Sequence, residues 1–263
     1  DFSGGFFLNN PELSKLQFDH RNTQLHDLDD GLLKDYDDSL KTFQKEHNLT
    51  IFHLMGQHVN YKLRYRKEQA KFWASSYEEK RPELTTAQRK MLSHYDNATL
   101  YNDSIVTQIV KRFQKENAIV IYVPDHGEEC YEEDRGFICR NHAANIDWPL
   151  AHYEFEIPFW IYCSPKYIKT HRDIYRQIRA AKDKRFMTDA LPHLLLYLAG
   201  IETPTYKEEY NILSPKYNEM RPRILKNSAD YDQLRDEHLK KVEKEKRKKE
   251  KRKKEKSKKG DKK

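Results

Sequence analysis

The sequence lacks several features that mark common protein classes. It has no run of about 18 apolar residues, so we expect no membrane-spanning segment in it. Cysteine is scarce, with three residues in 263, and no two of them form the Cys-x-x-Cys pair typical of metal or redox sites. The chain starts at Asp1 without an initiator methionine or a signal peptide, so we expect it to be a piece of a longer protein. Its length still allows a sizeable buried core.

The three cysteines do not determine the redox compartment. Cys130 and Cys139 flank a short loop, and they are close enough in sequence to form a disulfide in an oxidising environment. Cys163 lies in a strand-like run and is predicted to be a small buried hydrophobe. A paired and an unpaired state of Cys130 and Cys139 both stay open.

The net charge of +7 is concentrated at one end of the chain. Residues 240–263 hold sixteen Lys/Arg and five Asp/Glu, a net charge of +11, which leaves −4 for all preceding residues. Almost nothing apolar follows Val242, so residues 226–263 are predicted to be a charged tail, either helical or disordered. A solvated tail is the simplest interpretation, and binding to an anionic membrane or nucleic acid is the alternative. We expect no nucleic-acid partner, because the basic, aromatic stretch 61–76 has no continuous run of charge.

The run Ala118–Val123 is apolar and rich in β-branched residues, and it predicts a buried strand because polar residues do not alternate in it. Asp125, His126 and Gly127 follow directly, where ligands of open α/β sheets bind. A carboxylate beside an imidazole suits Zn²⁺, with Mn²⁺ as the alternative. Gly127 is expected to allow a sharp backbone turn there. By itself, Asp-His-Gly also fits an ordinary strand-end turn.

Two other apolar runs, 49–55 and 156–164, are also predicted to be strands. The first leads into Gly56-Gln57-His58, so a glycine and a histidine again follow a strand. Strands that alternate with helices predict an α/β fold for residues 1–225, with three α/β/α layers and a mainly parallel sheet. The three strand ends are expected to share one edge, bearing the side chains of His58, Asp125, His126 and His142. The helices are predicted at 29–47, 86–117, 168–181 and 187–199.

Five motifs occur in a fixed order at plausible spacing along residues 1–225. They are His53-Leu-Met-Gly-Gln-His58, Tyr95-Asp-Asn97 with Tyr101-Asn-Asp103, Tyr122-Val-Pro-Asp-His-Gly-Glu128, Glu156-Ile-Pro-Phe-Trp-Ile161, and Phe186-Met-Thr-Asp-Ala-Leu-Pro-His-Leu-Leu196 with Leu198-Ala-Gly-Ile201. Together they resemble the sulfatase-like catalytic domain of bacterial phosphoethanolamine transferases, in the alkaline phosphatase superfamily. The resemblance covers most of residues 1–225, and the tail lies outside it.

The resemblance implies a metal-dependent phosphoryl transfer. Members of the family hold zinc with an Asp-His pair, here Asp125 and His126, together with an upstream Glu and a nucleophilic Thr. The Thr takes phosphoethanolamine from phosphatidylethanolamine and passes it to lipid A or a related glycan. His58 and His142 match two histidines that contact the phosphoryl group or assist the leaving group. Glu128 is either a partner that orients His126 or a surface acid after a turn.

The family places its nucleophile and its membrane helices before everything seen here, and no Thr of this chain has the nucleophile's setting. We therefore expect the C-terminal portion of a catalytic domain that faces the periplasm at the bacterial inner membrane, held there through a segment absent from this chain. One alternative is a sulfatase or phosphodiesterase, a hydrolase of the same fold, although the chain has no Cys-x-Pro-x-Arg formylglycine motif. The other is a non-catalytic fragment that binds anionic partners through its basic tail.

Overall fold

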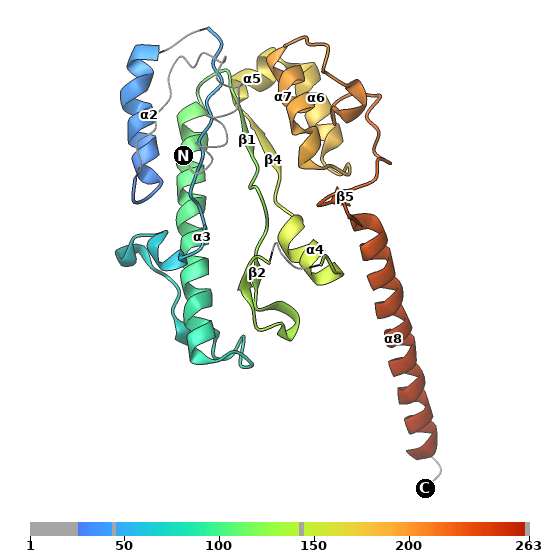
Figure 1. The fold of residues 1–263 in the computed structure, drawn as a ribbon. Helices are drawn as coiled ribbons and strands as arrows, with labels where there is room; N and C mark the ends of the chain where they lie inside the picture. Colours follow the sequence, from blue (N-terminus) through green and yellow to red (C-terminus); the bar gives the residue numbers. More distant parts are fainter. Residues whose placement is uncertain (1–25, 44–45, 142–144, 261–263) are drawn as a thin grey trace. The chain divides into compact units, whose positions relative to one another are not determined.

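The computed structural model describes residues 26–43, 46–141 and 145–260. The chain divides into two compact units, Asp1–Gln114 and Lys115–Lys263, and each is described by itself (Figure 1). Among the described residues, no helix combines the length and the apolar character that crossing a membrane requires.

The first unit is built around one long helix, α3 (Thr86–Phe113). It begins with a capping box in which Gln88 N donates to Thr85 Oγ1 at 3.3 Å and Thr85 N donates to Gln88 Oε1 at 2.8 Å. Its buried positions include Ala98, Ile105 and Ile109, at the spacing that places side chains on one helix face. The other elements of this unit are α2 (Asp30–Phe43) and the short 3-10 turns η2 (Tyr61–Leu63), η3 (Lys67–Gln69) and η4 (Ala74–Tyr77).

The polar stretch inside α3 has a structural role. Asn97 is 3% exposed, and its Oδ1 accepts from the backbone N–H groups of Lys71 and Phe72 at 2.7 and 3.1 Å. Its Nδ2 donates to the carbonyls of Phe72 and Ser93, both at 2.8 Å. A buried amide that is satisfied in this way ties the loop before η4 to the helix.

The strand predicted at residues 49–55 is absent: this described segment is irregular and belongs to no sheet. Leu49 and Ile51 are each 79% exposed, whereas Phe52 and Leu54 are partly buried. Burial alternates only between residues 51 and 54, and a strand also needs a neighbour for its backbone hydrogen bonds. The described residues supply no such neighbour, so the strand prediction was wrong here.

The second unit contains three two-stranded sheets, all antiparallel. The longest pairs β1 (Ile119–Tyr122) with β4 (Trp160–Cys163), in a register that sets Tyr122 opposite Trp160. The two rings stack with their centroids 5.3 Å apart. The others pair β2 (Glu129–Cys130) with β3 (Ile138–Cys139), and β5 (Ile224–Leu225) with β6 (Ala229–Asp230).

The prediction of a mainly parallel sheet is therefore wrong for the described residues. The two apolar runs that form β1 and β4 were recognised, but an apolar run carries no information on the direction of its neighbour. The arrangement in three layers stays a prediction.

Helices complete the second unit: α4 (Trp148–Phe155), α5 (Pro165–Thr170), α6 (Arg172–Ala181), α7 (Leu191–Ala199) and α8 (Tyr231–Gly260), with 3-10 turns η5 (Glu132–Asp134), η6 (Thr188–Ala190) and η7 (Glu208–Tyr210). One buried cluster joins Ala181, Leu194, Ile212 and Leu213. The rings of Phe159 and Phe186 stack against each other beside it, with centroids 4.9 Å apart. Helix α7 ends at Gly200, whose φ of +66° is the left-handed cap conformation that glycine adopts without strain.

The register of β2 and β3 separates the two cysteines of this ribbon. Cys130 lies opposite Ile138, and Cys139 lies opposite Glu129. Directly opposed residues share a face and consecutive residues alternate, so Cys130 and Cys139 belong to opposite faces. All three cysteines are free thiols, and burial raises the pKa of the Cys163 thiol, in agreement with its predicted role as a buried hydrophobe.

Candidate metal-binding site

Asp125 and His126 lie just beyond the end of β1, where the sequence predicted them. The Asp125 side chain is 88% exposed and the His126 side chain 20% exposed. Asp125 Oδ1 accepts from the backbone N–H of His126 at 3.1 Å and lies 3.6 Å from His126 Nε2. The carboxylate and the imidazole are thus side by side at a position that solvent and ions can reach.

The contact of His126 with the next residue defines its tautomer. Its Nδ1 lies 2.7 Å from the carbonyl oxygen of Gly127. Because a carbonyl oxygen only accepts, Nδ1 carries the proton and donates it. In the neutral ring Nε2 then carries the lone pair, which is the arrangement in which histidine ligates a metal ion while its other nitrogen is held by an acceptor.

Gly127 serves close packing rather than the predicted sharp turn. Its φ is not positive, unlike that of Gly56, Gly136 and Gly200. A Cβ at position 127 would lie 2.2 Å from the carbonyl oxygen of Tyr153, in α4. Only glycine allows this close approach of two backbones, and Gly127 N uses it to donate to the carbonyl of Glu154 at 2.8 Å.

A buried ion pair between Glu129 and Arg135 holds the segment that follows Gly127. Glu129 is fully buried, and Arg135 donates to its two oxygens at 2.7 and 3.0 Å. Arg135 also donates to Asp147, the N-cap of α4, at 3.2 Å. These hydrogen bonds, above all those to Glu129, raise the pKa of Arg135. The pair therefore connects the ribbon after His126 to the start of α4.

A second buried acid lies in α4. Glu154 is 1% exposed, and its Oε1 accepts from the backbone N–H of Asn141 at 2.5 Å. Sequence reasoning gave no role to Glu129, Arg135 or Glu154. Their partners are 6 to 13 residues away, and no helical or strand periodicity connects them.

The donor pair fits part of a zinc site. Catalytic zinc is held by about three protein ligands and structural zinc by about four. Asp125 and His126 supply two of the right chemistry. Within the described ranges, no group of three or more His, Cys, Asp or Glu side chains is arranged to hold a metal ion. A complete site therefore requires ligands beyond those described.

His58 lies in the first unit, in a loop that is held firmly. The carboxylate of Asp29 accepts from the backbone N–H groups of Met55 and Gly56 at 2.9 and 2.8 Å. His58 N donates to the carbonyl of Met55 at 3.1 Å, and Arg64 Nε donates to the carbonyl of His58, also at 3.1 Å. Asp29 is a residue that sequence reasoning missed. Asp29 is 8% exposed and directly precedes α2, whose first residue is also an acid. This position in the sequence did not indicate that the Asp29 carboxylate holds the loop before His58.

Two of the other predicted site residues gain no further assignment. His142 lies outside the described residues. Glu128 is half-buried, and the Gly127 carbonyl is one of the groups that contact His126. The role of Glu128, and the convergence of His58 and His142 with Asp125 and His126, stay predictions.

Comparison with known sequences agrees with the family resemblance that the motifs predicted. A sequence model of the sulfatase family matches residues 3–201. Phosphoethanolamine transferase EptC of Escherichia coli (strain K12) is 32% identical over 216 residues, which are 76% of this chain and 36% of that protein. The Kdo(2)-lipid A phosphoethanolamine 7''-transferase of Salmonella typhimurium (strain LT2) is 30% identical over 161 residues, 58% of this chain and 26% of that protein. The chain thus spans little more than a third of the EptC sequence.

Comparison with solved structures agrees as well. The C-terminal periplasmic domain of EptC from Escherichia coli, solved in complex with Zn, superposes with a TM-score of 0.66 at 27% identity, over 86% of this chain and 65% of that one. The corresponding domain of EptC from Campylobacter jejuni shares the fold, with a TM-score of 0.58 at 22% identity over 78% of this chain and 63% of that one.

Proposed function

This chain belongs to the sulfatase family, and we propose that it is part of a zinc-dependent phosphoethanolamine transferase. In this proposal the enzyme takes phosphoethanolamine from phosphatidylethanolamine and transfers it to lipid A or a related glycan. It does so at the bacterial inner membrane, with this domain facing the periplasm. Homology to phosphoethanolamine transferases supports the reaction class. The observation that carries the proposal is the Asp125–His126 pair, in which a backbone carbonyl orients His126 so that Nε2 would be the nitrogen that ligates the metal.

In this proposal, two residues of the chain bind the metal ion and two others contact the phosphoryl group or transfer a proton. Asp125 and His126 would hold the ion, which when bound lowers the pKa of the attacking hydroxyl and offsets charge on the transferring group. The hydrogen bond from Nδ1 to the Gly127 carbonyl orients the imidazole and would hold Nε2 in place for ligation. His58 and His142 are proposed to contact the phosphoryl group or protonate the leaving oxygen. We propose that the attacking threonine and the remaining ligands come from outside this chain.

The test compares two double variants that remove the same residue types. In D125A/H126A the proposed ligands are lost, whereas D173A/H47A removes an aspartate and a histidine whose side chains are 86% and 94% exposed elsewhere. Both variants are made in the longer protein that supplies the proposed threonine and remaining ligands. Its zinc content is measured by mass spectrometry, and its transfer activity is measured from labelled phosphatidylethanolamine to lipid A. We expect the first variant to bind zinc more than about 100-fold more weakly and to lose transfer, and the second to match the unmodified protein. Equal zinc content in both variants would refute the metal assignment.

A further inference from the structure

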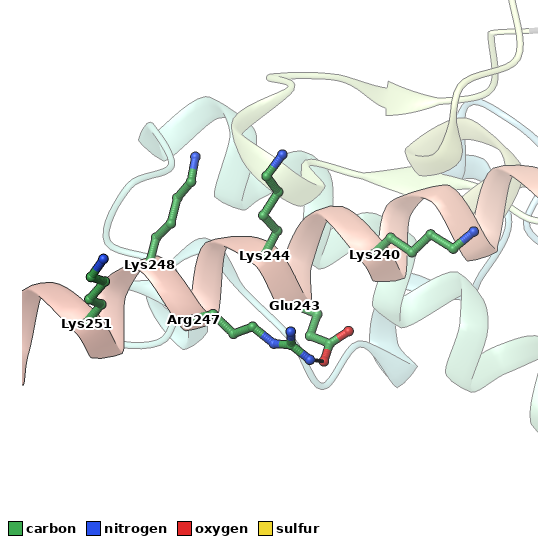
Figure 2. Close-up of a pocket in the computed structure, with 6 residues that line it drawn as sticks. All are labelled: Lys240, Glu243, Lys244, Arg247, Lys248 and Lys251. Atoms are coloured by element: carbon green, nitrogen blue, oxygen red, sulfur yellow. Dashed lines mark hydrogen bonds and ion pairs between the residues drawn. The ribbon is translucent and has the colours of Figure 1, made fainter.

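Helix α8 presents a row of lysines on one side. With about 3.6 residues per turn, one side of the helix between Lys240 and Lys251 contains what we call the lysine row: Lys240, Lys244, Lys248 and Lys251. Figure 2 shows Lys244, Lys248 and Lys251 extending from the same side of the helix. Arg247 lies on the same side of the helix by periodicity and Glu243 borders it. Their side chains turn away from the row and meet, with Arg247 Nη2 donating to Glu243 Oε1 at 2.5 Å. The row itself includes no acidic residue.

The opposite side of the same stretch is electrically neutral. The residues that fall there by helical periodicity are Val242, Glu245, Lys246, Lys249 and Glu250. Two lysines and two glutamates cancel, and the single apolar residue is half-buried. One side of this stretch is thus basic and the opposite side is neutral, and neither side is apolar. A helix of this kind is suited to lie against a negatively charged surface, and it has no apolar face to insert beneath one.

The base of α8 is fixed to α4 within the same unit. The indole of Trp148 stacks on His238 with centroids 5.4 Å apart and packs against Tyr231 at 5.6 Å. The Tyr231 hydroxyl donates to the carboxylate of Glu156. Asp232, in the first turn, accepts from Arg223 Nη2 at 2.6 Å. The lysine row begins two residues after His238, so these contacts hold the helix from which the row projects.

We propose that the lysine row of α8 binds the anionic headgroups of a phospholipid surface. The proposal rests on the proposed function, whose donor and acceptor are both lipids. Lysine is a flexible point charge, suited to a diffuse layer of phosphates rather than to one bidentate contact. Single-stranded nucleic acid fits less well, because its binding uses aromatic side chains for base stacking and no Phe, Tyr or Trp follows Tyr231.

The experiment uses residues 1–263, which carry the lysine row, and vesicles of two compositions: phosphatidylcholine alone, and phosphatidylcholine with about a third phosphatidylglycerol. Binding is measured by co-sedimentation. K244Q/K248Q removes two charges from the lysine row, and K246Q/K249Q removes two charges from the neutral side. A lysine near an anionic surface contributes about fivefold in affinity. We therefore expect K244Q/K248Q to weaken binding to the anionic vesicles about 25-fold, and K246Q/K249Q to weaken it less than about threefold. K244R/K248R should bind as the unmodified protein does.

Three results would overturn the proposal. They are equal binding to neutral and anionic vesicles, equal losses in the two Lys→Gln variants, and tighter binding to an RNA oligonucleotide than to the anionic vesicles at the same ionic strength. The D125A/H126A variant separates this inference from the proposed function. Vesicle binding that persists in a protein without zinc supports the lysine row, whatever the metal measurement decides. An unchanged circular dichroism spectrum of K244Q/K248Q would show that the loss of binding does not come from unfolding.

Discussion

Replacing Gly127 with alanine tests how the end of β1 is held next to α4. The new Cβ would lie 2.2 Å from the carbonyl oxygen of Tyr153 and 3.2 Å from that of Glu156. Both are backbone atoms, so no side-chain rotation relieves the clash. Overpacking of this kind costs about 1–3 kcal/mol, and disturbing the 2.8 Å hydrogen bond from Gly127 N to the Glu154 carbonyl adds about 1 kcal/mol. We expect a total near 3 kcal/mol, which lowers Tm by about 10 °C in a unit of this size.

The assay is thermal unfolding followed by circular dichroism, with zinc content measured on the same samples. G136A is the control, because Gly136 has a φ of +65° and nothing lies within 4 Å of its added Cβ. The control should lose only the cost of left-handed backbone, about 1–2 kcal/mol. We expect G127A also to bind zinc more weakly. The clash with α4 would displace the backbone at position 127, and with it the carbonyl that orients His126. If G127A were as stable as G136A or more so, the close approach to α4 would not be the reason for glycine here.

Two further predictions concern ion pairs of the second unit. Replacing Arg135 with methionine leaves the fully buried Glu129 without its Arg135 partner and should lower the free energy of unfolding by about 3–5 kcal/mol. Adding E129Q to this variant should restore part of that stability, and chemical denaturation measures both changes. The pKa of Asp232 is lowered, first by its hydrogen bond from Arg223. Its contribution to stability is therefore present above the unfolded value of about 4 and is lost as pH falls through the lower folded value. D232N should flatten the dependence of the unfolding free energy on pH below about 4, and an unchanged acid limb would contradict this role.

The local features of the chain could be predicted from its sequence. Periodicity identified α3 and α7, and the β-branched run at 118–123 identified β1, because both patterns involve residues near in sequence. The five motifs identified the family, which the sulfatase match over residues 3–201 confirms. The Asp125–His126 pair was found because it adjoins a recognisable strand.

Features that depend on distant partners could not be predicted in the same way. The predicted parallel direction was wrong for β1 and β4, which are antiparallel, because the hydrophobicity of a run indicates its burial and not the direction of its neighbour. Asp29 was missed because the backbone groups it binds are 26 and 27 residues away. The sequence pointed to Gly127, but it did not show why glycine is needed there. The clash that a side chain at position 127 would make with the Tyr153 carbonyl depends on the packing of α4.

The exposed segment 49–55 has a practical consequence for handling this chain. Its outward residues include Leu49 and Ile51, each 79% exposed, in a segment that belongs to no sheet. Exposed apolar segments without a neighbour pair readily with copies of themselves, which is how sheet edges start aggregates. Solubility at high concentration should therefore depend on this short stretch more than on the charged tail. A lysine at position 51 would act as a gatekeeper there, in the way natural proteins protect their open edges.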